Sequence, residues 1–152
     1  YLYQFAKESN EIERIYQAHK HKMHALVLAK LINTPRIELQ KLVGFVSIIQ
    51  PTARLRTKQE EQVFIGNHEG LSGELVTSKL HSLLDGINAN RISPHSAHMA
   101  YEDIHPFTDG NGRSGRALWL WQHIRNSTWS PNYLFLQMFY YETLASYHTL
   151  VK

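Results

Sequence analysis

The chain has 152 residues, enough for one domain with its own core, and its 43% of hydrophobic residues excludes wholesale disorder. The formal net charge is only +3, with 16 Lys and Arg against 13 Asp and Glu, so extended binding along a nucleic acid is not expected. The absence of Cys excludes disulfide scaffolds, thiolate zinc sites and cysteine nucleophiles.

Neither a membrane segment nor an export signal is predicted. No run approaches the ~20 consecutive apolar residues that a transmembrane helix needs, so no membrane partner is expected. The first residues, Tyr1 to Gln4, do not resemble a signal peptide, and because they lack Met we expect a trimmed or fragmentary chain. With the absence of Cys, these features favour the cytoplasm, and we expect a bacterial protein.

Helical periodicity dominates the first fifty residues. Apolar residues at spacings of three and four predict a helix that Ser9 caps and that continues to Leu31. Thr34 and Pro35 have the order of an N-cap and a first-turn proline. They predict a second helix, which stops near Pro51.

Residues 53–71 lose the helical period, which suits a short hairpin or an exposed loop. Helical spacing then resumes. The remaining helices are expected at 75–87, after the Ser93–Pro94 cap, at 116–125 and at 132–150. The sequence therefore predicts an all-α bundle with one β excursion near its middle.

Three histidines near the start of the chain raise the question of a metal site. On a helix His19 and His21 point about 160° apart, so these two and His24 do not share one face. Lys20 and Lys22 lie among them. We therefore expect a solvated basic face here and no zinc.

Residues 105–116 carry the densest set of chemical groups. A glycine-rich turn that enters a helix presents free N–H groups and the positive end of the helix dipole to an anion. Arg113 and Arg116 add donors shaped for phosphate oxygens, and Asp109 is a ligand that suits Mg²⁺. His105 can take a proton near pH 7. The segment predicts a phosphate site with a metal ion and a general base.

This segment resembles the signature of the Fic domain family, His-x-Phe-x-(Asp/Glu)-Gly-Asn-Gly-Arg-x-x-Arg, at all eight specified positions. Ile104 and the preceding helix through Ala97 and His98 also resemble the family. The resemblance implies an all-α, Fic-type helical bundle with one short β-hairpin flap, in a single domain over residues 1–152. It implies an enzyme, a protein adenylyltransferase that moves AMP from ATP, with Mg²⁺, to a Ser, Thr or Tyr hydroxyl of a target protein.

The resemblance gives each position of the motif a role. His105 becomes the base that deprotonates the target hydroxyl, Asp109 binds the Mg²⁺ between the phosphates, and Phe107 anchors the loop in the core. The implied nucleotide-binding residues are Gly110, Asn111, Gly112, Arg113, Gly115 and Arg116, with Arg116 on the γ-phosphate. The kinase-like branch of the family departs from the motif at Asp109 and its neighbours, so the intact motif favours AMP transfer.

Part of the N-terminal segment 1–33 resembles the family's inhibitory helix, whose pattern is (Ser/Thr)-x-x-x-Glu-(Gly/Asn). Ser9 and Glu13 match, and Arg14 replaces the Gly or Asn. The resemblance implies a Glu13–Arg116 pair that blocks the γ-phosphate position and inhibits the enzyme. Alternatively, Glu13 is a solvated carboxylate in the first turn of a helix. With Arg14 in place, the first helix is expected to run on unbroken.

Two further assignments come from the resemblance. Residues 53–71 resemble the flap, a β-hairpin that pairs with the target by strand addition, and an ordinary surface hairpin is the alternative. The expected edge of the flap is Val63, Phe64, Ile65 and Gly66. Tyr141 resembles an adenine contact of relatives, although aromatic residues at helical spacing are also typical of a core.

Other functions stay open at this level. One is the reverse reaction, removal of AMP from a modified protein. Another is a silenced Fic module that acts as a binding or toxin–antitoxin component. A third is a helical nucleic-acid-binding domain, with the basic residues Arg54, Arg56 and Lys58 and the segment 20–22, although the low overall charge stands against it. The target protein, its modified residue and the choice between monomer and homodimer are not specified.

Overall fold

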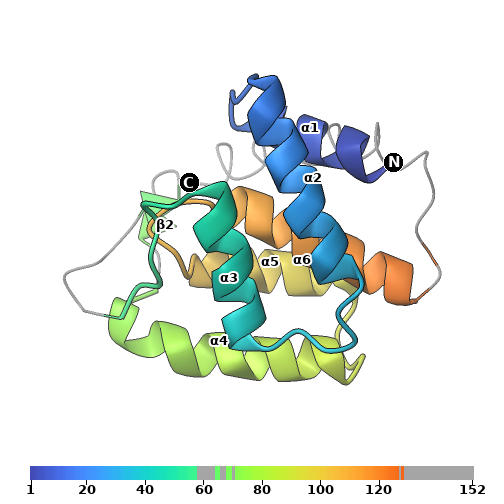
Figure 1. Cartoon of the computed structure of the whole chain (residues 1–152). Helices are drawn as coiled ribbons and strands as arrows, with labels where there is room; N and C mark the ends of the chain where they lie inside the picture. The colour runs from blue at the N-terminus through green and yellow to red at the C-terminus, as the bar shows by residue number, and fades with distance from the viewer. Residues whose placement is uncertain (58–63, 66–67, 70, 127, 129–152) are drawn as a thin grey trace.

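The computed structural model of the chain describes residues 1–57, 64–65, 68–69, 71–126 and 128. This part of the chain is helical apart from one pair of two-residue strands (Figure 1). Its helices are α1 (Leu2–Ile12), α2 (Ala18–Ile32), α3 (Leu39–Ile49), α4 (Gly73–Asn88), α5 (Pro94–Ile104) and α6 (Asn111–Arg125). The strands β1 (Phe64–Ile65) and β2 (His68–Glu69) pair antiparallel.

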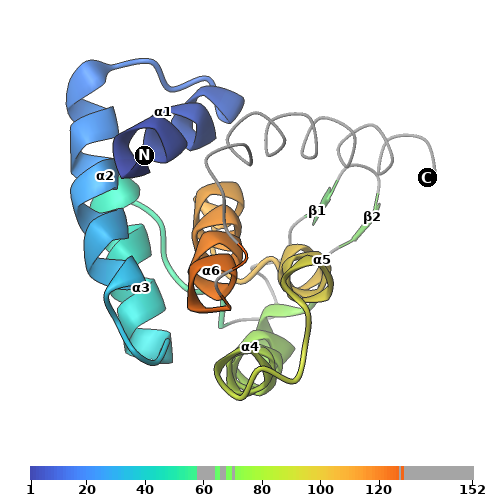
Figure 2. The ribbon, with the colours of Figure 1, turned by 90° about the vertical axis from the view of Figure 1, so that its right-hand side faces the viewer.

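Helix α6 is the centre of the bundle. It contacts α1, α2, α3 and α5, and Figure 2 shows it between the α1–α3 group and the α4–α5 pair. Nearly every residue from Asn111 to Gln122 is buried, polar ones included. A helix buried on all sides lies in a core, so the polar residues of α6 must find partners there.

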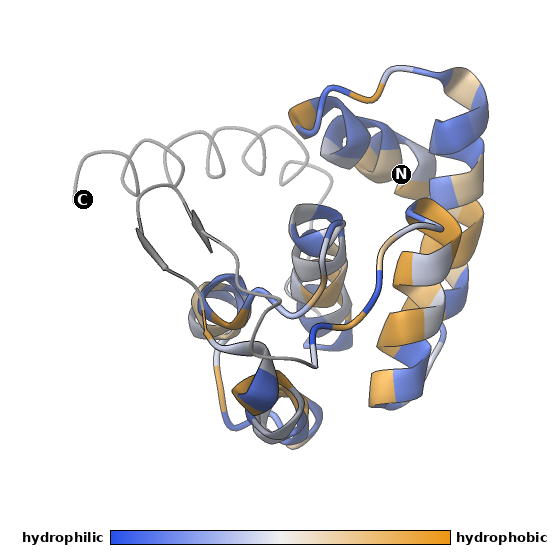
Figure 3. Cartoon of the chain, turned by 90° about the vertical axis from the view of Figure 1, so that its left-hand side faces the viewer, coloured by the Kyte–Doolittle hydropathy of each residue, from blue (hydrophilic) through white to orange (hydrophobic). Residues whose placement is uncertain are grey.

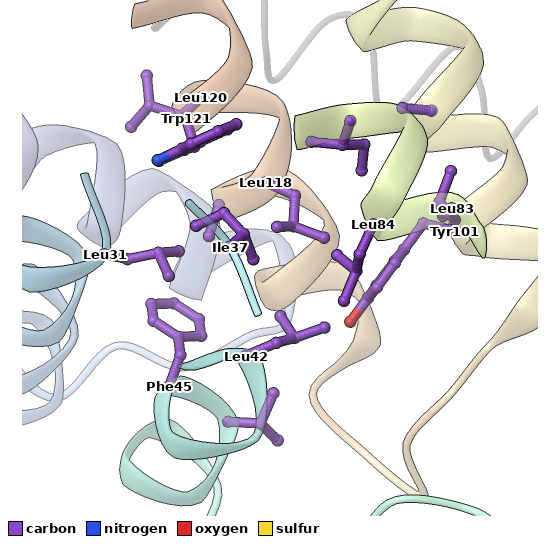
Figure 4. Packing of buried hydrophobic residues seen from close by; sticks show 14 of the residues in the cluster. Leu31, Ile37, Leu42, Phe45, Leu83, Leu84, Tyr101, Leu118, Leu120 and Trp121 are labelled. Atoms are coloured by element: carbon purple, nitrogen blue, oxygen red, sulfur yellow. The ribbon is translucent and has the colours of Figure 1, made fainter. Parts of the chain in front are cut away.

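The hydrophobic core surrounds α6. Leucines and aromatic residues from α2, α3, α4 and α5 converge on it (Figure 4). Core residues that Figure 4 labels are Leu31, Ile37, Leu42, Phe45, Leu83, Leu84, Tyr101, Leu118, Leu120 and Trp121. Helices α2 and α3 also leave apolar residues such as Leu26 and Ile48 exposed. Figure 3 shows hydrophobic stretches along these helices. None of the described helices is both long and apolar enough to cross a membrane.

The prediction of one helix from Ser9 to Leu31 is wrong. Helix α1 begins at Leu2 and ends at Ile12, so Ser9 lies inside it rather than at its cap, and α2 begins only at Ala18. The apolar spacing continues across the gap because both helices bury one face in the same bundle. Spacing alone therefore does not reveal the turn between them.

The second helix also begins later than predicted. The Thr34 hydroxyl donates to Lys30 O and so closes α2, and α3 starts at Leu39. The connection between them is held extended, because Ile37 exchanges two hydrogen bonds of 2.7 and 2.8 Å with the Asn88 side chain. The predicted end of this helix before Pro51 is confirmed.

The predicted positions of the helices between residues 71 and 126 agree more closely with the structure. Helix α4 covers the predicted span, and α5 starts at Pro94 with the Ser93 hydroxyl accepting the Ser96 N–H at 3.1 Å. Helix α6 starts at Asn111 rather than at 116, because the motif itself forms its first turn. The helix predicted at 132–150 lies outside the described residues.

Burial along α4 gives a direct test of this core. Leu80 is fully buried, whereas Leu75 of the same helix is 48% exposed. We expect Leu80→Ala to lower the free energy of unfolding by about 2–5 kcal/mol, because it leaves a cavity. The matched control Leu75→Ala should change it by less than about 0.5 kcal/mol. Urea unfolding measures both, and equal losses would contradict the placement of α4.

Candidate anion site at the start of α6

A tight loop brings the chain from α5 into α6. Gly110 is the N-cap of α6 and has φ 81, a conformation that glycine adopts without a steric cost. The Asn111 side chain binds both backbone groups of Phe107, with two hydrogen bonds of 2.8 Å. Phe107 itself is buried in the core, as its predicted anchoring role requires. The loop is thus fixed at both ends.

The first turn of α6 has the properties of an anion site. The first backbone hydrogen bond inside this turn runs from Ser114 N to Gly110 O. The N–H groups of residues 111–113 therefore precede the hydrogen-bonded ladder and point out of the helix end. With the positive end of the helix dipole, they attract negative charge.

Arg56 holds the end of α5 next to this turn. It is completely buried and donates from Nε to His105 O at 2.7 Å and from Nη2 to Ile104 O at 2.8 Å. Its burial removes it from the set of basic residues considered for nucleic-acid contact, and Lys58 of that set lies outside the described residues. No sequence pattern indicates this positioning role, since Arg56 stands in an irregular polar stretch.

His105 follows α5 in the left-handed region, with φ 50. Burial lowers the pKa of its imidazole, the positive charge of Arg56 lowers it further, and the Asp109 carboxylate acts in the opposite direction. Its Nδ1 is buried and has no hydrogen-bond partner among the described residues. His105 is therefore a neutral imidazole at pH 7, in the state that accepts a proton.

Two further motif side chains are held at the same end of α6. Asp109 is exposed, and its Oδ1 accepts the Gly110 N–H at 2.8 Å, which leaves the carboxylate open to solvent. Arg113 is buried and donates to Ile49 O and to Gln50 Oε1, each at 3.1 Å. The end of α3 therefore positions one of the two arginines.

The other arginine, Arg116, is bound by the end of α1. It donates from Nε to Ser9 Oγ at 2.8 Å, and from Nη2 to Ser9 O at 3.0 Å and to Glu13 Oε1 at 2.9 Å. The structure thus brings together the Glu13–Arg116 pair that the sequence predicted. A Cβ atom at Gly112 would collide with Glu13 Oε1, so the carboxylate lies against the first turn of α6.

The end of α1 is a tight turn with a residue in the left-handed region. Arg14 N donates to Glu11 O and Ile15 N donates to Asn10 O, the two bonds of a Schellman motif. Arg14 occupies the C′ position of this motif with φ 61, where Gly or Asn is usual. Contrary to the expectation of an unbroken helix, Arg14 therefore ends α1 in the conformation that a Gly or Asn would adopt.

Gly115 has a structural explanation. A Cβ at this position would lie 3.0 Å from a Tyr101 ring atom and 3.4 Å from a His98 ring atom, so the glycine lets α5 and α6 approach closely. His98 itself is buried, with Nε2 3.5 Å from Glu102 Oε1. The packing gives Gly115 a structural role, and nothing here tests the nucleotide contact that the resemblance implies for it.

His21 and His24 do not form the solvated basic face that the sequence predicted. Both are buried and bind the Asn10 side chain of α1, whereas His19 is exposed. The prediction failed because it did not place a separate helix against this side of α2.

Of the remaining residues with a predicted role, the structure describes only two. Phe64 and Ile65 form β1, and nothing here tests their docking role. Val63, Gly66 and Tyr141 lie outside the described residues.

Comparison with known families extends the match beyond the motif. The model of the Fic/DOC family matches residues 67–122. This part of the chain is similar to the Fic/DOC family. It runs from β2 through α4 and α5 into α6 and includes the whole motif 105–116. No curated protein matches the chain. Ser9, Glu13 and Arg56 precede the matched Fic/DOC segment, so their connection to it rests on the contacts described above.

The Schellman end of α1 yields a second prediction. We expect Arg14→Gly to raise the free energy of unfolding by about 1 kcal/mol, because a non-glycine residue in the left-handed region carries a cost of roughly that size. Arg14→Ala is the control, since it removes the same side chain and keeps the cost. Urea unfolding distinguishes them, and equal stability of the Gly and Ala variants would contradict this geometry.

Proposed function

We propose that this Fic/DOC protein is an adenylyltransferase that transfers AMP from ATP to a Ser, Thr or Tyr hydroxyl of a target protein, and that Glu13 inhibits it. The observation that carries the proposal is the position of the Glu13 carboxylate. It lies against the first turn of α6 and binds the Arg116 guanidinium, where the phosphate of a nucleotide would otherwise bind.

The proposed reaction needs no covalent intermediate on the protein. The target hydroxyl oxygen bonds to the α-phosphorus, the bond from that phosphorus to the bridging oxygen breaks, and pyrophosphate leaves. The hydroxyl proton goes to His105. Such transfers depend on in-line positioning and on donors fixed around the developing charge. The α6 N-terminus and the two arginines, each held by another helix, are donors of this kind.

Asp109 suits the Mg²⁺ that the reaction requires. Among the described residues no three His, Asp or Glu side chains gather into a metal cluster. Mg²⁺ is usually held by one or two carboxylates, with substrate phosphates and waters completing its shell. An exposed carboxylate that Gly110 N–H orients beside the anion site matches that requirement. When bound, Mg²⁺ would neutralise charge on the phosphates.

The inhibition follows from the same contacts. Arg116 is almost fully buried and gives three hydrogen bonds to Ser9 and Glu13. A triphosphate that used Arg116 would have to displace Glu13, whose side chain is 40% exposed and can swing outward. Ser9 would stay in place, because it is buried within α1. Nucleotide and Glu13 thus compete for one guanidinium.

Removing the carboxylate tests the proposal. We expect Glu13→Gly to increase label transfer from α-labelled ATP, onto the protein itself or a target, by roughly 10- to 100-fold, the worth of a hydrogen bond to a charged group. Glu11→Gly is the control, since it removes a neighbouring carboxylate of α1, two residues before Glu13. The double variant with His105→Ala should transfer nothing. Transfer that survives His105→Ala would refute the assigned base, and no transfer from Glu13→Gly would refute the inhibitory role.

The ionisation of His105 gives a pH test. Burial and the charge of Arg56 lower the pKa of this imidazole from its ordinary value of 6.5. The imidazole therefore stays neutral, and able to accept a proton, at pH values somewhat below 6.5. In the Glu13→Gly variant, we expect the acidic limb of the transfer rate to have its midpoint below pH 6.5. A midpoint at or above pH 6.5 would show that His105 does not act as the base in this environment.

A further inference from the structure

A buried polar cluster joins α1 to α2 beside the anion site. The Asn10 side chain lies between two histidines of α2, with Nδ2 2.9 Å from His21 Nδ1 and Oδ1 2.8 Å from His24 Nδ1. All three residues are at most 3% exposed. An amide oxygen only accepts and an amide nitrogen only donates, so His24 Nδ1 carries a hydrogen and His21 Nδ1 does not.

Aromatic contacts enclose the two rings. His21 meets Tyr3 of α1 edge to face, with ring centroids 6.4 Å apart, and His24 meets Phe45 of α3 at 5.6 Å. Burial lowers the pKa of His24 to about 3, with further lowering from the charges of Arg113, Arg116 and His21. The hydrogen bond between His24 and Asn10 therefore involves a neutral imidazole near pH 7.

The backbone of Asn10 belongs to the inhibitory end of α1. Asn10 O accepts the N–H groups of Glu13 and Ile15, each at 2.9 Å, which closes the Schellman motif around Arg14. The preceding residue, Ser9, accepts two hydrogen bonds from Arg116. Asn10 thus connects α2, which its side chain binds, to the turn that carries Glu13.

We propose that Asn10, His21 and His24 form a latch that positions Ser9 and Glu13 on Arg116. Its effect on nucleotide binding rests on the proposed function, whereas its effect on α1 does not. Asn10 is then a positioning residue of the inhibited state. No role for these three residues was expected from the motif.

The chemistry of the latch suits a contact that opens. Three apolar side chains of similar size would hold α1 by burial alone, and water would oppose their separation. An amide and two imidazoles regain hydrogen bonds from water when α1 lifts away, so the net cost of separation is smaller. While the cluster is closed, both imidazoles bind the Asn10 side chain, so substitution of any one of the three leaves a buried polar atom without this partner.

A pair of variants at His24 tests the latch. His24→Leu removes the donor to Asn10 Oδ1, whereas His24→Asn places an amide N–H near the position of Nδ1 and keeps it. Amide hydrogen exchange of the full chain is the first measurement. For His24→Leu we expect exchange in α1 to accelerate at least tenfold while α4 stays protected, and for His24→Asn a return toward the wild-type rate.

ATP binding with Mg²⁺ is the second measurement. We expect His24→Leu and Asn10→Ala to tighten it in the same direction as Glu13→Gly, with Glu11→Ala as the unchanged control. Unaltered α1 exchange in His24→Leu would overturn the latch, and so would equal acceleration in α1 and α4. Faster α1 exchange with unchanged ATP binding would overturn the positioning role if Glu13→Gly does tighten binding. If Glu13→Gly has no effect, the proposed function fails and α1 exchange alone decides the latch.

Discussion

The buried Arg116 guanidinium is the constraint on which the rest of this arrangement depends. It lies in the most buried helix of the bundle, where a positive charge needs an anion and several acceptors. Ser9 and Glu13 supply them from the opposite end of the chain. Because Ser9 binds Arg116 through both its hydroxyl and its carbonyl, α1 has to dock on α6 in one register.

Several local features follow from this contact. Gly112 leaves room for the Glu13 carboxylate, since a Cβ there would collide with it. Arg14 adopts a left-handed conformation because α1 has to end at this point for the carboxylate to reach the first turn of α6. Asn10 completes that turn and binds α2 as well. The same end of α6 that attracts a nucleotide phosphate is thus occupied by the protein's own carboxylate.

The sequence allowed the motif to be predicted more fully than the helices that surround it. Residues 105–116 are contiguous, so their chemistry could be interpreted directly, and the resemblance of Ser9 and Glu13 to the family's inhibitory helix implied the contact with Arg116. The break between α1 and α2 could not be predicted, because Arg14 carries no glycine signal. His21 and His24 were misplaced for a related reason, since their burial depends on a helix that the periodicity had merged with their own. Arg56 acts through backbone contacts 48 and 49 residues away, which no local pattern encodes.

The central claim is that Glu13 competes with the terminal phosphates of a nucleotide for Arg116. The most direct measurement is calorimetric titration of ATP and of AMP, with Mg²⁺, into the wild-type protein and Glu13→Gln. Gln has nearly the same shape as Glu and lacks its charge. We predict that the substitution tightens ATP binding roughly tenfold, in keeping with the loss of a charged hydrogen bond, and that it changes AMP binding far less. Equal effects on both nucleotides, or none on ATP, would contradict the account.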